Sequence, residues 1–125
     1  MEIKVVIKNL KAEVKQVKAE IKESKNYLKD KETPQQLAWI EEKINDIDDN
    51  YVSLLDIAKE GNKARLVKDI NNSFELLSSI YAGLSFNYAM WVFLRDLNGI
   101  EEINYVDAKR DFFREKSNAL KEIKY

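Results

Sequence analysis

Five carboxylates follow one outward line of a predicted helix between residues 34 and 60: Glu42, Asp46, Asp49, Asp56 and Glu60. Carboxylates three, four or seven residues apart share a helix face, and their oxygens are ligands that Mg²⁺ prefers. One face of one helix nevertheless supplies too few converging ligands, and Asn45 stands where a second glutamate would complete a metal-binding ExxE motif. We therefore expect a solvated acidic face and no metal site.

Histidine and cysteine are both absent from the 125 residues. Their absence excludes the commonest general base, thiolate metal sites, disulfides and cysteine nucleophiles. The remaining candidates crowd the C-terminal segment, where Asp107, Arg110, Asp111 and Arg114 have the three- and four-residue spacing of surface ion pairs. The sequence contains no phosphate-binding loop and no nucleophile elbow. We therefore predict a protein that is not an enzyme and binds no cofactor.

Lysine recurs between residues 4 and 29 in the three- and four-residue steps of a helix. In a heptad frame with Ile7 at position a, the lysines occupy positions e and b, so they form one ridge beside the apolar seam. The e positions hold Lys4, Lys11, Lys18 and Lys25, and the b positions hold Lys8, Lys15, Lys22 and Lys29.

Two interpretations of this ridge remain open. An antiparallel hairpin would bring Glu41 and Asp48 toward the e lysines and so set the register, each exposed pair contributing about 0.3–0.5 kcal/mol. Residues 1–31 hold nine lysines against five acidic residues, whereas residues 32–61 hold eight acidic residues against two lysines. The hairpin does not reach the b lysines, whose spacing of about 10 Å along the helix suits nucleic-acid phosphates or an acidic protein face.

The segment from residue 63 to 98 has apolar residues on every side of its second half. Residues 76–94 carry no charge, but their length is borderline for a membrane span and they include several polar side chains, so we expect a central helix and no membrane. Phe86 and Phe93 lie farthest from the seam. A helix that is apolar all round must be covered all round, either by the last helix or by another chain.

We predict that this second half is a protein interface, since aromatic side chains beside small residues are typical anchors of interface cores. A second copy in a two-fold dimer is the favoured partner, and a role as a subunit or inhibitor of a larger complex comes next. The alternative is a nucleic-acid-associated subunit that uses the b lysines. The predicted contact residues are Phe86, Phe93, Met90, Ser79, Ala82 and Gly83.

Four amphipathic helices would position these surfaces. The apolar periodicity predicts helices at about 2–31, 34–60, 63–98 and 102–123 in one domain, 1–125, and Gly83 is a point where the third can kink or split. Short connections favour antiparallel neighbours. We therefore expect an all-α, up-and-down antiparallel helical bundle whose first two helices form a coiled-coil hairpin.

The composition gives weaker indications of origin and location. Net charge is -1, there is no cysteine, and lysines interrupt the apolar N-terminal run, so we expect a cytoplasmic protein without a signal peptide. The small size and the bias toward Lys, Ile, Glu and Asn are typical of phage, viral and mobile-element proteins.

Overall fold

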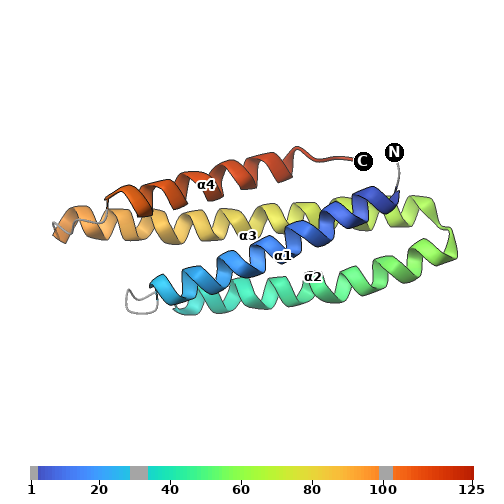
Figure 1. Cartoon of the computed structure of the whole chain (residues 1–125), viewed down its shortest axis with the longest axis horizontal. Helices are drawn as coiled ribbons and strands as arrows, with labels where there is room; N and C mark the ends of the chain where they lie inside the picture. Colours follow the sequence, from blue (N-terminus) through green and yellow to red (C-terminus); the bar gives the residue numbers. More distant parts are fainter. Residues whose placement is uncertain (1–2, 29–33, 99–102) are drawn as a thin grey trace.

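The structure, a computed structural model, describes residues 3–28, 34–98 and 103–125 (Figure 1). Four helices occupy these ranges: α1 (Ile3–Leu28), α2 (Pro34–Glu60), α3 (Lys63–Asn98) and α4 (Ile103–Lys121). No strand is present in the described part of the chain. The prediction of an all-α helical bundle is confirmed.

Three residues mark the two ends of α2 and the start of α3. Pro34 starts α2, where its missing amide hydrogen costs no intrahelical bond. Gly61 follows the end of α2 with φ of 77°, a left-handed conformation that glycine adopts without strain. The Oδ1 atom of Asn62 accepts a hydrogen bond of 3.2 Å from the amide of Arg65 and so caps the start of α3. This two-residue connection turns the chain back on itself.

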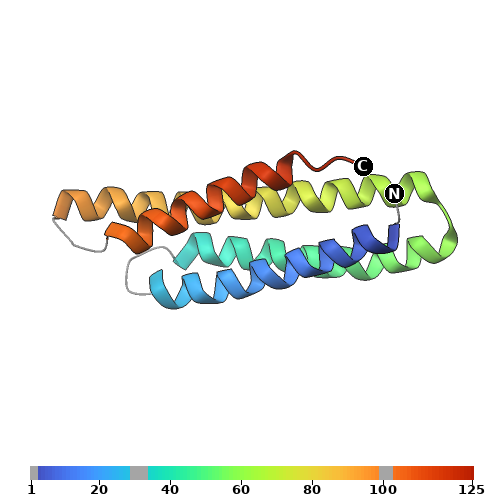
Figure 2. The same cartoon turned by 45° about the horizontal axis from the view of Figure 1, so that its top comes forward.

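Serines join α3 and α4 at two levels. Ser78 Oγ donates to the carbonyl of Ser117 at 2.7 Å, and Ser117 Oγ donates to the carbonyl of Ser78 at 2.8 Å. One heptad further along α3, Ser85 Oγ donates to the carbonyl of Arg110 at 2.9 Å. A step of seven residues forward in α3 matches seven backward in α4, so the two helices are antiparallel. Figures 1 and 2 show the same reversal at each connection.

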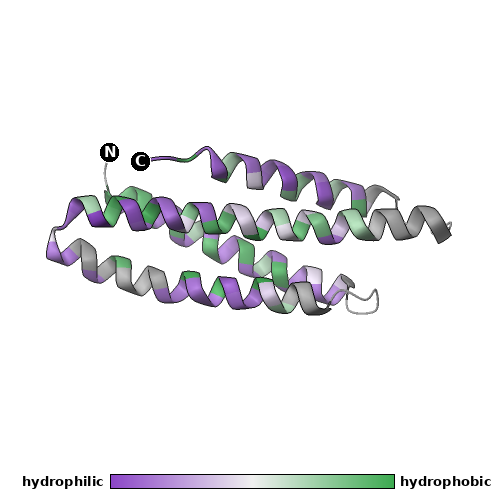
Figure 3. Ribbon diagram, turned by 180° about the vertical axis from the view of Figure 1, so that it is seen from behind, coloured by the Kyte–Doolittle hydropathy of each residue, from purple (hydrophilic) through white to green (hydrophobic). Residues whose placement is uncertain are grey.

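The central helix is α3, because it packs against all three of the others. Hydrophobic and hydrophilic residues alternate along the described helices, as Figure 3 shows for the far side of the bundle. The apolar side chains meet in one continuous core, and burial of this surface is the main source of stability. Its fully buried members include Leu10, Val17, Ile40, Ile70, Leu77, Ile80, Leu84, Val106 and Phe113.

The helix α3 is not split at Gly83, since it continues from Lys63 to Asn98. Gly83 instead lies where the start of α2 passes close: a Cβ atom there would be 3.4 Å from Cδ1 of Ile40 and 3.6 Å from Cζ3 of Trp39. Gly83 therefore takes part in packing within the chain. Within the ranges that the structure describes, no helix combines the length and apolar character needed to cross a bilayer.

Candidate interaction surfaces

The predicted ion pairs between α1 and α2 are confirmed. Lys25 Nζ lies 2.8 Å from Oε1 of Glu41, and Lys18 forms an ion pair with Asp48. A step of seven residues along α1 again matches seven backward along α2. These side chains are 40–46% exposed, so each pair contributes a few tenths of a kcal/mol up to about 1 kcal/mol and serves mainly to set the register.

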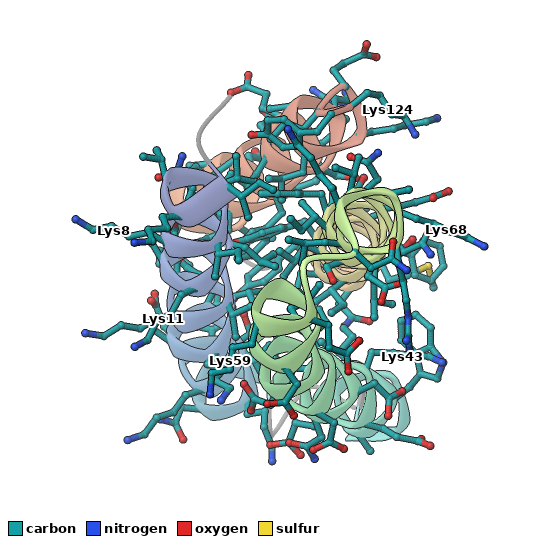
Figure 4. All side chains as sticks on the ribbon, turned by 90° about the vertical axis from the view of Figure 1, so that its right-hand side faces the viewer. Lys8, Lys11, Lys43, Lys59, Lys68 and Lys124 are labelled. Carbon is teal, nitrogen blue, oxygen red and sulfur yellow. The ribbon has the colours of Figure 1, made fainter. Side chains whose placement is uncertain are left out.

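Three of the four b lysines have no ion-pair partner among the described residues. Lys8, Lys15 and Lys22 are exposed and form no ion pair with any described residue, and Lys29 lies outside the described residues. Figure 4, viewed along the bundle, shows Lys8 pointing away from the other helices. We call Lys8, Lys15 and Lys22 the lysine strip.

The outward face of α2 also carries exposed charges without an ion-pair partner among the described residues, and these charges are negative. Glu42, Asp49 and Asp56 are exposed, recur every seven residues and form no ion pair with a described residue. We call these three the acidic strip. Asp46 and Glu60 lie beside it and are also exposed. In the described ranges, no group of three acidic residues gathers closely enough to hold a metal ion.

The acidic residues of α1 are bound by α4, which the sequence reasoning missed. Lys116 Nζ lies 2.8 Å from Oε1 of Glu13, and Lys109 Nζ lies 2.9 Å from Oε2 of Glu20. Lys109 also lies 3.2 Å from Oε1 of Glu23. The equal spacing was a partial signal, because the two lysines are seven residues apart and so are Glu13 and Glu20, but it does not indicate that α4 lies beside α1.

The contact between α1 and α4 shifts the pKa values of Glu23, Tyr105 and Lys109 away from neutral pH. The hydroxyl of Tyr105 donates to Glu23 at 2.6 Å, and this bond, with a second from Lys109, lowers the pKa of Glu23. Burial raises the pKa of Tyr105, and its bond to the Glu23 carboxylate raises it further. Burial opposes the charge on Lys109, but hydrogen bonds to Glu20 and Glu23 outweigh it and raise the Lys109 pKa. None of these three groups is poised to exchange a proton near neutral pH, so the contact is structural.

The one aromatic residue of α1 is engaged inside the bundle. The ring of Tyr27 stacks on Tyr88 with centroids 6.0 Å apart and meets Tyr105 at 4.8 Å. The hydroxyl of Tyr88 donates to Oγ of Ser24 at 3.1 Å, which gives a buried partner to the single polar residue of the α1 seam. Tyr27 is therefore not free to stack on a nucleic-acid base.

Four of the six predicted interface residues lie on one solvent-facing stripe of α3, and a fifth, Gly83, packs against α2. Phe86 is 52% exposed and Met90 is 41% exposed, and Ser79 and Ala82 are also exposed. The side chain of Phe93 lies outside the described residues. The helix α4 does not cover this stripe. Its Phe113 enters the core, where the ring lies 5.9 Å from that of Tyr81, and Phe112 is itself 39% exposed.

A further aromatic, Trp39 of α2, extends this stripe across to the neighbouring helix. Its indole lies over Gly83, is 45% exposed and has Lys43 Nζ 5.8 Å from the ring centroid. The sequence reasoning did not select Trp39, although its position off the α2 seam was a usable signal. We call Trp39, Phe86 and Met90, with the small residues Ser79 and Ala82, the apolar patch.

The described chain thus presents three outward surfaces: the lysine strip, the acidic strip and the apolar patch. The two strips occupy the hairpin of α1 and α2, and the patch spans α2 and α3. Comparison with known protein families, curated proteins and solved structures finds no match to this chain.

Proposed function

We propose that this protein is a non-catalytic assembly module that associates with a second copy of itself through the apolar patch. One observation carries the proposal. The exposed stripe of α3 begins with charged residues, Lys68 and Glu75, and continues two helical turns later with Ala82, Phe86 and Met90. The solvent-facing stripe of this helix therefore changes from polar to apolar residues along its length. Contact with water alone would favour polar residues throughout.

Burial of the patch would be favourable. Removing apolar surface from water contributes about 25 cal/mol per Å². Scattered exposed apolar residues are ordinary, but contiguous ones mark interaction sites. Trp39, Phe86 and Met90 come from two neighbouring helices and belong to the residue types enriched in interface cores. The patch therefore has both the continuity and the composition of a contact surface.

The shape of the patch suits a second copy. Phe86 lies seven residues from Ser79 and four from Ala82, so one large side chain stands next to two small ones on the same stripe. A two-fold axis crossing α3 between Ala82 and Gly83 would lay Phe86 of each copy on Ser79 of the other. Such a self-complementary contact is the simplest route to a closed dimer.

The test is the mass in solution of the double variant Phe86→Asp, Met90→Asp. We expect the normal protein to be a dimer at high salt, where apolar contacts persist. Four buried carboxylates per dimer should raise the dissociation constant by about 100-fold or more. Analytical ultracentrifugation over a concentration series measures both.

The matched control is Phe112→Asp, which places the same charge at an exposed phenylalanine of α4, away from the patch. It should leave the dissociation constant unchanged. Circular dichroism melting checks that each variant folds. A normal protein that stays a single chain at all concentrations would overturn the proposal, as would a double variant with unchanged dimerisation.

A further inference from the structure

The outer face of the α1–α2 hairpin carries two parallel strips of opposite charge. The lysine strip and the acidic strip each contain three exposed charges at seven-residue intervals, about 10 Å apart along the helices. Neither strip has an ion-pair partner among the described residues. Between them lie the satisfied pairs Lys18–Asp48 and Lys25–Glu41. The hairpin pairs some of its charges internally, and these six are among those left without an ion-pair partner in the described residues.

The heights of the two strips also agree. The ion pairs put Lys18 level with Asp48 and Lys25 level with Glu41. Counting residues along both helices from these pairs gives the position of each strip residue along the hairpin axis. Each lysine of the strip then lies two residues, or about 3 Å at 1.5 Å per residue, from the axial position of one acid. The resulting partners at nearly equal height are Lys22 with Glu42, Lys15 with Asp49 and Lys8 with Asp56.

We propose that a second copy of the chain docks on this hairpin face, with the lysine strip of each copy on the acidic strip of the other. A two-fold axis parallel to the helices preserves height and exchanges α1 with α2. It therefore brings each of the three lysines of one copy near the acid at the same height in the other copy, and the symmetry repeats these three contacts with the copies exchanged. A two-fold axis running across the hairpin would instead place lysines on lysines, so charge selects the first arrangement.

A uniformly charged polyanion fits this face less well. The acidic strip lies on the helix next to the lysine strip, so a polyanion that approaches the lysines is also repelled by the acids, most strongly at low salt. The helix α1 also contains no arginine, and its Tyr27 is stacked on Tyr88 and Tyr105. A second face with the same two strips is attracted along both.

This contact is independent of the proposed function. It uses the outer faces of α1 and α2, whereas the apolar patch lies across α2 and α3. The two contacts also respond differently to salt, because screening weakens exposed ion pairs while apolar burial persists. Association that disappears with salt therefore reports on the strips, and association that remains reports on the patch.

The experiment combines two charge-reversal variants. The first carries Lys8→Glu, Lys15→Glu and Lys22→Glu, and the second carries Glu42→Lys, Asp49→Lys and Asp56→Lys. Light scattering is recorded at about 0.01 M salt, with a Debye length of about 30 Å, and at about 1 M, with about 3 Å. The normal protein should have a low-salt mass at least twice its high-salt mass, because each dimer joined through the apolar patch presents two hairpin faces. Each variant alone should lose this increase, and an equal mixture of the two should regain it.

The matched control reverses three other exposed lysines without ion pairs among the described residues, Lys68, Lys121 and Lys124, and should keep the increase. Circular dichroism confirms that each variant folds. A normal protein whose mass does not change with salt overturns the proposal. So does a lysine-strip variant that still doubles its mass, or a mixture that fails to regain the increase.

A duplex DNA added at low salt tests the other occupant. If the normal protein binds DNA without doubling its own mass, and the acidic-strip variant binds the DNA more tightly, the lysine strip serves phosphates and the proposal is overturned.

Discussion

The two flanks of α1 carry opposite charges, and the rest of the chain meets them differently. On the side toward α4, Glu13 and Glu20 are paired with lysines, and these side chains are only 17–23% exposed. On the side toward α2, the paired side chains are 40–46% exposed, and the lysine strip beyond them forms no ion pair with a described residue. Ion pairs thus hold α4 against one flank of α1, whereas the other flank leaves exposed lysines facing solvent.

The reason lies in the helix that each flank faces. In the described ranges, no close backbone approach joins α1 to α4, whereas α1 does approach α2 and α3 closely. The gap between α1 and α4 is therefore bridged by long side chains, whose charges are partly removed from water. Ion pairs in that environment are costly to break, while fully solvated ones matter little.

The largest effect should come from Lys109→Ala on the α4 flank. This change leaves Glu20 and Glu23 without their shared cation and opens space beside a partly buried carboxylate. We expect the free energy of unfolding to fall by about 1–3 kcal/mol, in line with hydrogen bonds to charged groups. Urea denaturation measures it. Lys121→Ala, at an exposed and unpaired position of α4, is the control, and an equal loss in both would show that the contact has no special role.

A smaller effect should come from Lys25→Ala on the α2 flank. Its ion pair with Glu41 is 45–46% exposed, so we expect a loss of about 0.3–0.5 kcal/mol. The same urea denaturation, repeated at high salt, should show the difference from the normal protein disappearing. A loss as large as that of Lys109→Ala would contradict the distinction between the two flanks.

The smallest effect concerns acid. The pKa of Glu23 in the folded chain lies below its ordinary value of 4.5, so its contribution to stability is complete above pH 4.5 and is lost as pH falls through the lowered pKa. Its side chain is 50% exposed, which keeps this contribution small. Thermal melts between about pH 5 and pH 3 should therefore show a slightly smaller drop for Glu23→Gln than for the normal protein. Parallel melting curves would contradict the assignment.

Much of the fold could be predicted because heptad periodicity is a local signal. Position e of a heptad faces the neighbouring helix whatever the rest of the chain does, so Lys18 and Lys25 could be matched with Asp48 and Glu41. The acids Glu13 and Glu20 could not be matched in the same way. Their partners depend on which helix closes the bundle beside α1, and that is decided by tertiary packing.

The candidate patch was only partly accessible to sequence reasoning for a related reason. Apolar residues on every side of α3 are compatible with complete burial or with an interface, and no local pattern separates the two. The position of α4 decides it. This helix lies against Ser78 and Ser85 of α3, whose hydroxyls bond the carbonyls of Ser117 and Arg110, so Phe86 is left uncovered. The position of Trp39 off the α2 seam marks it as outward, but its place beside Gly83 of α3 depends on how the helices pack.

The reciprocal bonds of Ser78 and Ser117 have a consequence for the interior. Each hydroxyl reaches the main chain of the facing helix, so at this level the two rods touch with almost nothing between them. A bulkier residue at either site, such as valine, would clash with the facing main chain and force the two helices apart. Separating the two helices would draw the buried Phe113 ring away from Tyr81 and Tyr88, so this aromatic packing depends on two small serine side chains.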